Sequence, residues 1–187
     1  MASRVDESPA TARLEQPRIL VVGHKKTNLS VLTRRLSDGG YRVTSAADSA
    51  SAIAELHRSP FDLVIADLHL PRTSGAELTR LIRDDSAWSD TPVMLITGRS
   101  DPQEAVRAYE AGADDVILKP FHFEVLFARI ERRLEAVRAL KALRCDNAVL
   151  DARIITRAIQ IRELRDQVRE LEAERHRLRM FAPAARA

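Results

Sequence analysis

Three polar side chains that could together hold a phosphoryl group each follow an apolar run of the chain. Asp67 comes after F-D-L-V-I-A, Thr97 after P-V-M-L-I, and Lys119 after V-I-L. A carboxylate can act as a nucleophile, while a hydroxyl and an ammonium can donate hydrogen bonds to phosphoryl oxygens. If the runs are parallel strands, their carboxyl ends open on one crevice, and the three side chains should meet there.

The elements that would position these side chains alternate along residues 18–118. Strands are expected at 18–22, 41–46, 61–66, 92–96 and 116–118, and amphipathic helices at 28–37, 48–58, 74–83 and 101–111. Asn28 is the expected N-cap of the first helix. The first helix should end at Gly39-Gly40 and the fourth at Gly112. This alternation predicts an α/β fold, a parallel sheet with helices on both faces.

A different pattern begins after Pro120. Residues 122–179 contain no proline and no glycine, which predicts one uninterrupted helix. At about 1.5 Å per residue it would be roughly 85 Å long. We divide the chain into a disordered tail (1–17), an α/β domain (18–135), a helix continuous with the last domain helix (136–180) and a flexible tail (181–187).

A heptad repeat runs along this helix and predicts a parallel, two-stranded coiled coil, because β-branched residues at a and leucine at d favour dimers. Asn147 at an a position would fix the register. Arg157 and Arg175 are polar exceptions. A monomeric amphipathic helix packed on another domain is the competing interpretation, which the sustained 3.5-residue period disfavours. The seam comprises Leu140, Leu143, Asn147, Leu150, Ile154, Ile161, Leu164, Val168, Leu171 and Leu178.

Composition limits the possible functions. The 187 residues are 45% hydrophobic and carry a net charge of +3, with arginine and glutamate interleaved, so binding to nucleic acid is not expected. No apolar run approaches the roughly 20 residues of a membrane span. The single cysteine, Cys145, excludes an intrachain disulfide and favours the cytoplasm. The histidines lack the spacing of metal ligands.

The three motifs together make the chain similar to a known family. The segments around Asp67, Thr97 and Lys119-Pro120 resemble the receiver domain of two-component response regulators over roughly residues 18–135. The resemblance implies a flavodoxin-like (CheY-like) fold with strand order 2-1-3-4-5 and a cis peptide bond at Lys119-Pro120. It also implies that Asp67 is the phospho-acceptor position, with Thr97, Gly98 and Lys119 as the equivalents of the phosphoryl pocket.

The sequence departs from this family at the metal site. Typical receivers end the first strand with two acids that help the acceptor aspartate hold Mg²⁺. Here Gly23 and His24 take those places. Glycine offers no ligand, and imidazole is a poor ligand for Mg²⁺, which needs hard oxygen donors. Val116 also replaces the aromatic switch residue of the fifth strand. The sequence therefore predicts no bound metal, no cofactor and no catalytic residue.

These features favour a non-enzymatic bacterial signalling adaptor: a pseudo-receiver, independent of phosphorylation, in which Asp67 is a structural carboxylate paired with Lys119. A coiled-coil homodimer would present two docking faces, around the fourth helix, fifth strand and fifth helix, to a kinase, another regulator or a scaffold. Alternatively, Asp67 accepts phosphate with the help of Mg²⁺ and signals through the coiled coil to a separate output partner. In a third interpretation the chain is a fragment or relic of a longer regulator, because a receiver and a coiled coil often precede an output domain in the family that it resembles. No output-domain motif occurs in the sequence, so output would have to come from a partner.

Overall fold

The computed structural model describes residues 16–98 and 102–181, and it divides after Val137 into two units. The first unit is an α/β domain, and the second is the remainder of the last helix. The predicted N-terminal tail lies outside the described residues except at positions 16 and 17. Of the predicted C-terminal tail, only Phe181 is described, as the last residue of that helix.

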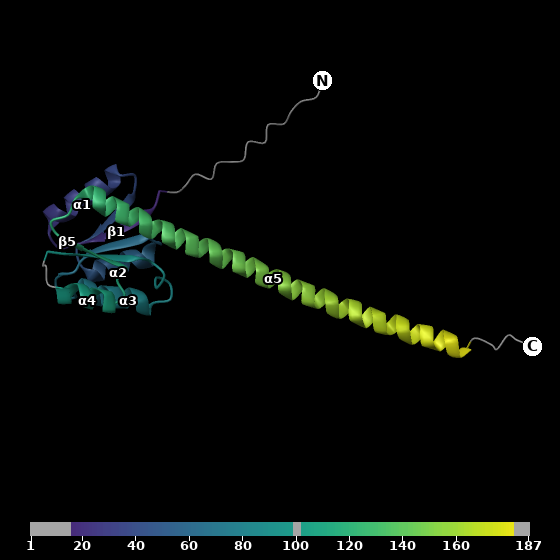
Figure 1. The fold of residues 1–187 in the computed structure, drawn as a ribbon. Helices are drawn as coiled ribbons and strands as arrows, with labels where there is room; N and C mark the ends of the chain where they lie inside the picture. The colour runs from purple at the N-terminus through teal and green to yellow at the C-terminus, as the bar shows by residue number, and fades with distance from the viewer. Residues whose placement is uncertain (1–15, 99–101, 182–187) are drawn as a thin grey trace, which may run out of the picture. The chain divides into compact units, whose positions relative to one another are not determined.

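The α/β domain contains one sheet of five parallel strands (Figure 1): β1 Arg18–Val22, β2 Arg42–Ala46, β3 Leu63–Asp67, β4 Val93–Thr97 and β5 Asp115–Leu118. Their order in the sheet is β2-β1-β3-β4-β5, which confirms the predicted fold class. The strands β1, β3 and β4 are nearly continuous runs of buried residues, as expected for a parallel sheet covered on both faces.

The core forms two layers, one on each face of the sheet, and helices cover both layers. The bounds of the first four are α1 Lys26–Asp38, α2 Ser49–Arg58, α3 Gly75–Asp84 and α4 Pro102–Glu110. On one face, side chains of α2, α3 and α4 such as Leu56, Leu78 and Ala108 pack with Leu20 and Val64 of the sheet. On the other face, α1 and the start of the last helix pack over the alternate strand residues.

The last helix, α5, spans Phe123–Phe181, so the predicted long helix is confirmed. In the first unit, Leu126, Ile130 and Leu134 of α5 are buried against the sheet. Arg129 Nη1 forms an ion pair with Asp115 Oδ1 of β5 at 2.9 Å, which fixes the start of α5 beside that strand. None of the described helices is both long enough and apolar enough to cross a bilayer.

Local signals set most of the helix boundaries. Asp48 and Ser74 begin α2 and α3, each through a reciprocal capping box with the residue three positions on. Gly40 and Gly112 have φ of 90° and 92°, as expected for residues that end helices in the left-handed region. The prediction for Asn28 is wrong. α1 begins two residues earlier, after Lys25, which makes no side-chain cap, and Asn28 lies in the first turn of the helix.

Candidate functional site

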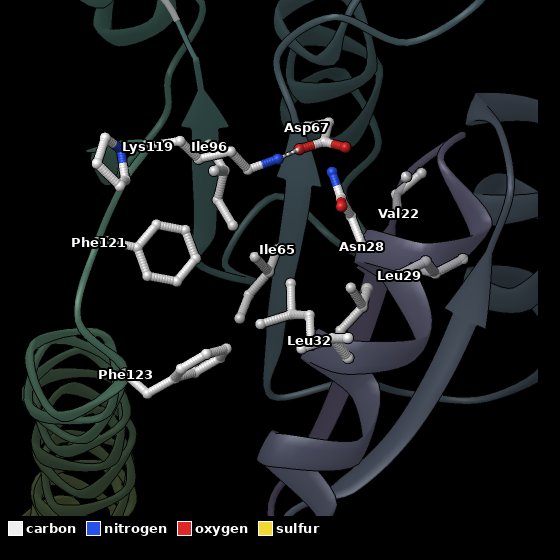
Figure 2. A pocket seen from close by; sticks show the side chains of 14 residues that line it. Val22, Asn28, Leu29, Leu32, Ile65, Asp67, Ile96, Lys119, Phe121 and Phe123 are labelled. Carbon is white, nitrogen blue, oxygen red and sulfur yellow. Dashed lines mark hydrogen bonds and ion pairs between the residues drawn. The ribbon is translucent and has the colours of Figure 1, made fainter.

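The carboxyl ends of β3, β4 and β5 bring the three polar side chains to one crevice. Asp67 ends β3, Thr97 ends β4, and Lys119 follows β5, with its peptide N–H donating to the Thr97 carbonyl at 2.7 Å. Lys119 Nζ lies 2.6 Å from Asp67 Oδ1 and forms an ion pair with it (Figure 2). The peptide bond at Lys119-Pro120 is cis, as the resemblance implies.

Thr97 turns toward α4 in this structure. Its hydroxyl is almost fully buried and donates a hydrogen bond of 2.9 Å to Glu104 Oε2. The other oxygen of that carboxylate, Oε1, lies 3.2 Å from His69 Nε2. Sequence reasoning missed both Glu104 and His69. Their signals were weak, because Glu104 is an ordinary acidic residue in the first turn of a helix and His69 is an isolated histidine in a loop.

The end of β1 packs directly against the Asp67 carboxylate. Gly23 is buried, and a Cβ atom built on it would lie 3.0 Å from Asp67 Oδ2, closer than side chains normally approach. Its peptide N–H donates to the Ala46 carbonyl, so the backbone is held in the sheet. His24 is exposed beside it. The space that an acidic side chain would occupy at position 23 is therefore taken up in part by Asp67 itself.

These residues do not fit a magnesium ion. Asp67 already pairs with Lys119, and Gly23 contributes no side chain. Lys25 adds a positive charge to the lining of the cavity that contains the pair. Within the part of the chain that the structure describes, no group of three or more histidine, cysteine, aspartate or glutamate side chains is placed to hold a metal. Mg²⁺ needs several hard oxygen ligands, and one paired carboxylate does not supply them.

Two adjoining cavities meet at the Asp67–Lys119 pair. The polar cavity, of about 260 Å³, includes the strand-end residues Thr97 and Gly98. The apolar cavity, of about 340 Å³, extends from the pair between α1 and the start of α5 (Figure 2). Val116 lines neither of them. It is half-buried and packs against the core on the α2–α3–α4 face.

The surface of α5 beyond Val137 is exposed and bears large apolar side chains. Most predicted seam residues are exposed, among them Leu143, Ile154, Leu164 and Leu171, while the side chain of Leu178 lies outside the described residues. The sequence analysis did not identify a further set of exposed apolar side chains on this helix. Val149, Ile155 and Ile159 are also exposed, and their c, b and f positions put them on the side of the helix away from the seam.

Comparison with known proteins identifies the class that this fold and crevice define. The family model described as "Response regulator receiver domain" matches residues 19–131, and the chain belongs to that family. Among solved structures, the signal receiver domain of a histidine kinase from Syntrophus aciditrophicus is 33% identical with a TM-score of 0.61, covering 65% of this chain and 92% of its own. The BeF3-activated DrrB receiver domain is also 33% identical, with a TM-score of 0.59, covering 64% and 98%.

The curated relatives are longer proteins. Transcriptional regulatory protein TcrA of Mycobacterium tuberculosis is 34% identical over 65% of this chain and 47% of its own length. A probable cyclic di-GMP phosphodiesterase of Vibrio cholerae is 28% identical over 83% of this chain and 35% of its own length. The chain thus spans about half or less of the length of these relatives.

Proposed function

We propose that this protein is a non-enzymatic cytoplasmic signalling adaptor whose receiver domain acts without phosphorylation and whose α5 helix forms a coiled-coil homodimer. The observation that carries the proposal is the charge arrangement in the strand-end crevice. The carboxylate at the acceptor position is joined to Lys119 at 2.6 Å, and the two positions that hold acids in typical receivers are Gly23 and His24.

Phosphoryl transfer to a carboxylate brings two negatively charged groups together, the carboxylate and the phosphoryl group. Divalent cations usually neutralise that charge and supply much of the stabilisation of the transition state. The crevice lacks the ligands for such a cation, and Asp67 would have to give up its ion pair to attack. Both features favour a structural role for Asp67, in which the pair ties the end of β3 to the β5–α5 connection.

A docking face for a protein partner is supported on the α4–β5–α5 side of the domain. Val106 and Tyr109 of α4, Leu118 of β5 and Val125 of α5 are large apolar side chains, each about half exposed. Clusters of exposed apolar side chains commonly mark protein-binding sites. A sensor kinase, another regulator or a scaffold protein would be the partner.

The coiled coil is supported by the heptad positions of α5. A helix that exposes leucine, isoleucine and valine at successive a and d positions gains stability by burying them against an identical helix. Two receiver domains held by one coiled coil would bind a bivalent partner with higher avidity than either domain alone. The dimer would therefore set the spacing of two docking faces.

A phospho-accepting regulator is the second candidate, favoured by the presence of Asp67, Thr97 and Lys119 around one crevice. Beryllofluoride with Mg²⁺, a mimic of the phosphoryl group, distinguishes the two candidates. In amide NMR spectra of the full chain, the adaptor predicts no shifts at these three residues beyond those in an Asp67→Asn variant. Saturable shifts that the variant lacks would establish the phospho-acceptor and contradict the adaptor.

A further inference from the structure

We propose that the apolar cavity beside the Asp67–Lys119 pair is a binding site for a small amphipathic carboxylate, with its apolar body in the cavity and its carboxylate at the pair. The proposal does not depend on whether Asp67 can be phosphorylated. It needs only the shape of the cavity and the charges at its polar end.

The walls of the cavity are apolar over most of their area. Leu29 and Leu32 of α1 face Phe123, the first residue of α5, and Phe121, which precedes it (Figure 2). Ile65 and Ile96 form the floor. The volume of about 340 Å³ lies at the lower end of the roughly 300–1,000 Å³ of small-molecule sites. The two aromatic rings are in edge-to-face contact, with centroids 5.7 Å apart, and together make one wall of the cavity apolar. These features suit a small aromatic or aliphatic body.

The polar end of the cavity carries two ammonium groups, those of Lys119 and Lys25. Asp67, Lys119 and Asn28 line both cavities at the point where they meet. Lys25 lines the polar cavity and forms no ion pair with a carboxylate of the described residues. The side chains lining the two cavities include the ammonium groups of Lys25 and Lys119 and the carboxylate of Asp67, whereas the Glu104 carboxylate is not part of the lining and is held by Thr97 and His69. Lys119, Lys25 and the Asn28 amide could bind a monoanionic head group by charge-assisted hydrogen bonds.

A bound molecule would touch the first residues of α5. Phe123 packs against Phe127, with ring centroids 6.5 Å apart, and the Arg35 guanidinium lies 5.5 Å from the Phe123 ring centre. Phe121 and Phe123 are therefore in contact with both the cavity and the aromatic cluster that seats α5 on α1. A ligand in the cavity would change the packing of that cluster, which gives the domain an input that needs no covalent modification.

The test uses 2-naphthoate, octanoate and uncharged 2-naphthalenemethanol as probes of the full chain by titration calorimetry. We expect at least one of the two carboxylates to bind with a dissociation constant below about 1 mM, and the alcohol to bind at least tenfold more weakly than 2-naphthoate. Nuclear Overhauser contacts from the bound carboxylate to the rings of Phe121 and Phe123 in the unmodified protein would place it in the cavity.

Three variants separate this site from nonspecific adsorption. Leu32→Trp fills the cavity and should abolish binding, whereas Leu81→Trp, an exposed leucine on α3 away from the cavity, should leave it unchanged. Lys119→Met should weaken the binding of 2-naphthoate at least tenfold and should change the binding of the alcohol only slightly. The proposal is overturned if neither carboxylate binds, if the alcohol binds as tightly as the acid, or if the ring contacts arise elsewhere.

Discussion

Asp67 Oδ2, at the end of β3, lies 3.0 Å from the position that a Cβ atom on Gly23 at the end of β1 would take, which is closer than ordinary van der Waals contact. The absence of a side chain at position 23 allows the Asp67 carboxylate to settle against the backbone while its other oxygen binds Lys119. One oxygen of the Asp67 carboxylate thus lies against position 23 and the other pairs with Lys119.

Restoring the acids should recover metal binding. We expect the Gly23→Asp/His24→Asp variant to bind Mg²⁺ in the millimolar range, because it adds two oxygen donors beside Asp67, whose side chain needs to move by only a few tenths of an ångström. Calorimetric titration of Mg²⁺ measures this. The unmodified protein and a His57→Asp variant, which changes the charge at an exposed site elsewhere, should show no saturable binding.

The Asp67–Lys119 pair should contribute modestly to stability. In a double-mutant cycle of Asp67→Asn and Lys119→Met, followed by urea unfolding, we expect a coupling free energy of about 1 kcal/mol. The value is small because both side chains are partly exposed to water. Additive effects of the two substitutions would show that the pair does not hold the strand ends together.

The sequence was sufficient to predict the strand order, the long helix and the convergence of Asp67, Thr97 and Lys119, because all of these follow from periodicity, chain connectivity and a family resemblance. The hydrogen bond from Thr97 to Glu104 could not be predicted. It depends on the rotation of one buried hydroxyl and on how α4 sits beside β4, and neither leaves a pattern in the sequence.

The start of α1 shows a second limit. Asn28 is a good capping residue, yet the helix begins two residues earlier, where Lys25 makes no side-chain cap. Capping preferences are worth about 1 kcal/mol, which is too little to set a helix boundary by themselves. The apolar cavity was equally hidden, because it results from the distance between α1 and the start of α5.

The seam of α5 can be tested with two neighbouring isoleucines. Ile161 lies at an a position and Ile159 at an f position, and their exposed fractions, 51% and 54%, are nearly the same. We expect light scattering to show a dimer for the unmodified chain and for Ile159→Asp, and a monomer or a dimer weakened at least tenfold for Ile161→Asp. Equal effects of the two substitutions would contradict the assigned seam.

Acid should weaken the capping box of α3. Hydrogen bonds from the Ser74 backbone and side chain lower the pKa of Glu77 below its ordinary value of 4.5. A lowered pKa in the folded state means that Glu77 stabilises the fold above pH 4.5 and that this contribution is lost as the pH falls through the folded-state pKa. Between pH 5 and 3, roughly, the thermal midpoint of Glu77→Gln should fall less steeply than that of the unmodified protein.

A matched variant separates this effect from the general acid sensitivity of the protein. Ser74→Ala removes the hydroxyl partner of Glu77 but keeps the carboxylate, so the pH dependence should flatten in part. Identical slopes for the unmodified protein and Glu77→Gln would show that the capping box contributes nothing to the acid response.

The most direct measurement is exposure of the full chain to acetyl phosphate with millimolar Mg²⁺, followed by intact-mass spectrometry. The charge arrangement around Asp67 predicts no added phosphoryl group on the unmodified protein, so that its spectrum matches that of Asp67→Asn. The Gly23→Asp/His24→Asp variant serves as the control in which the metal site is restored. A phosphoryl adduct on the unmodified protein that disappears in Asp67→Asn would contradict the account.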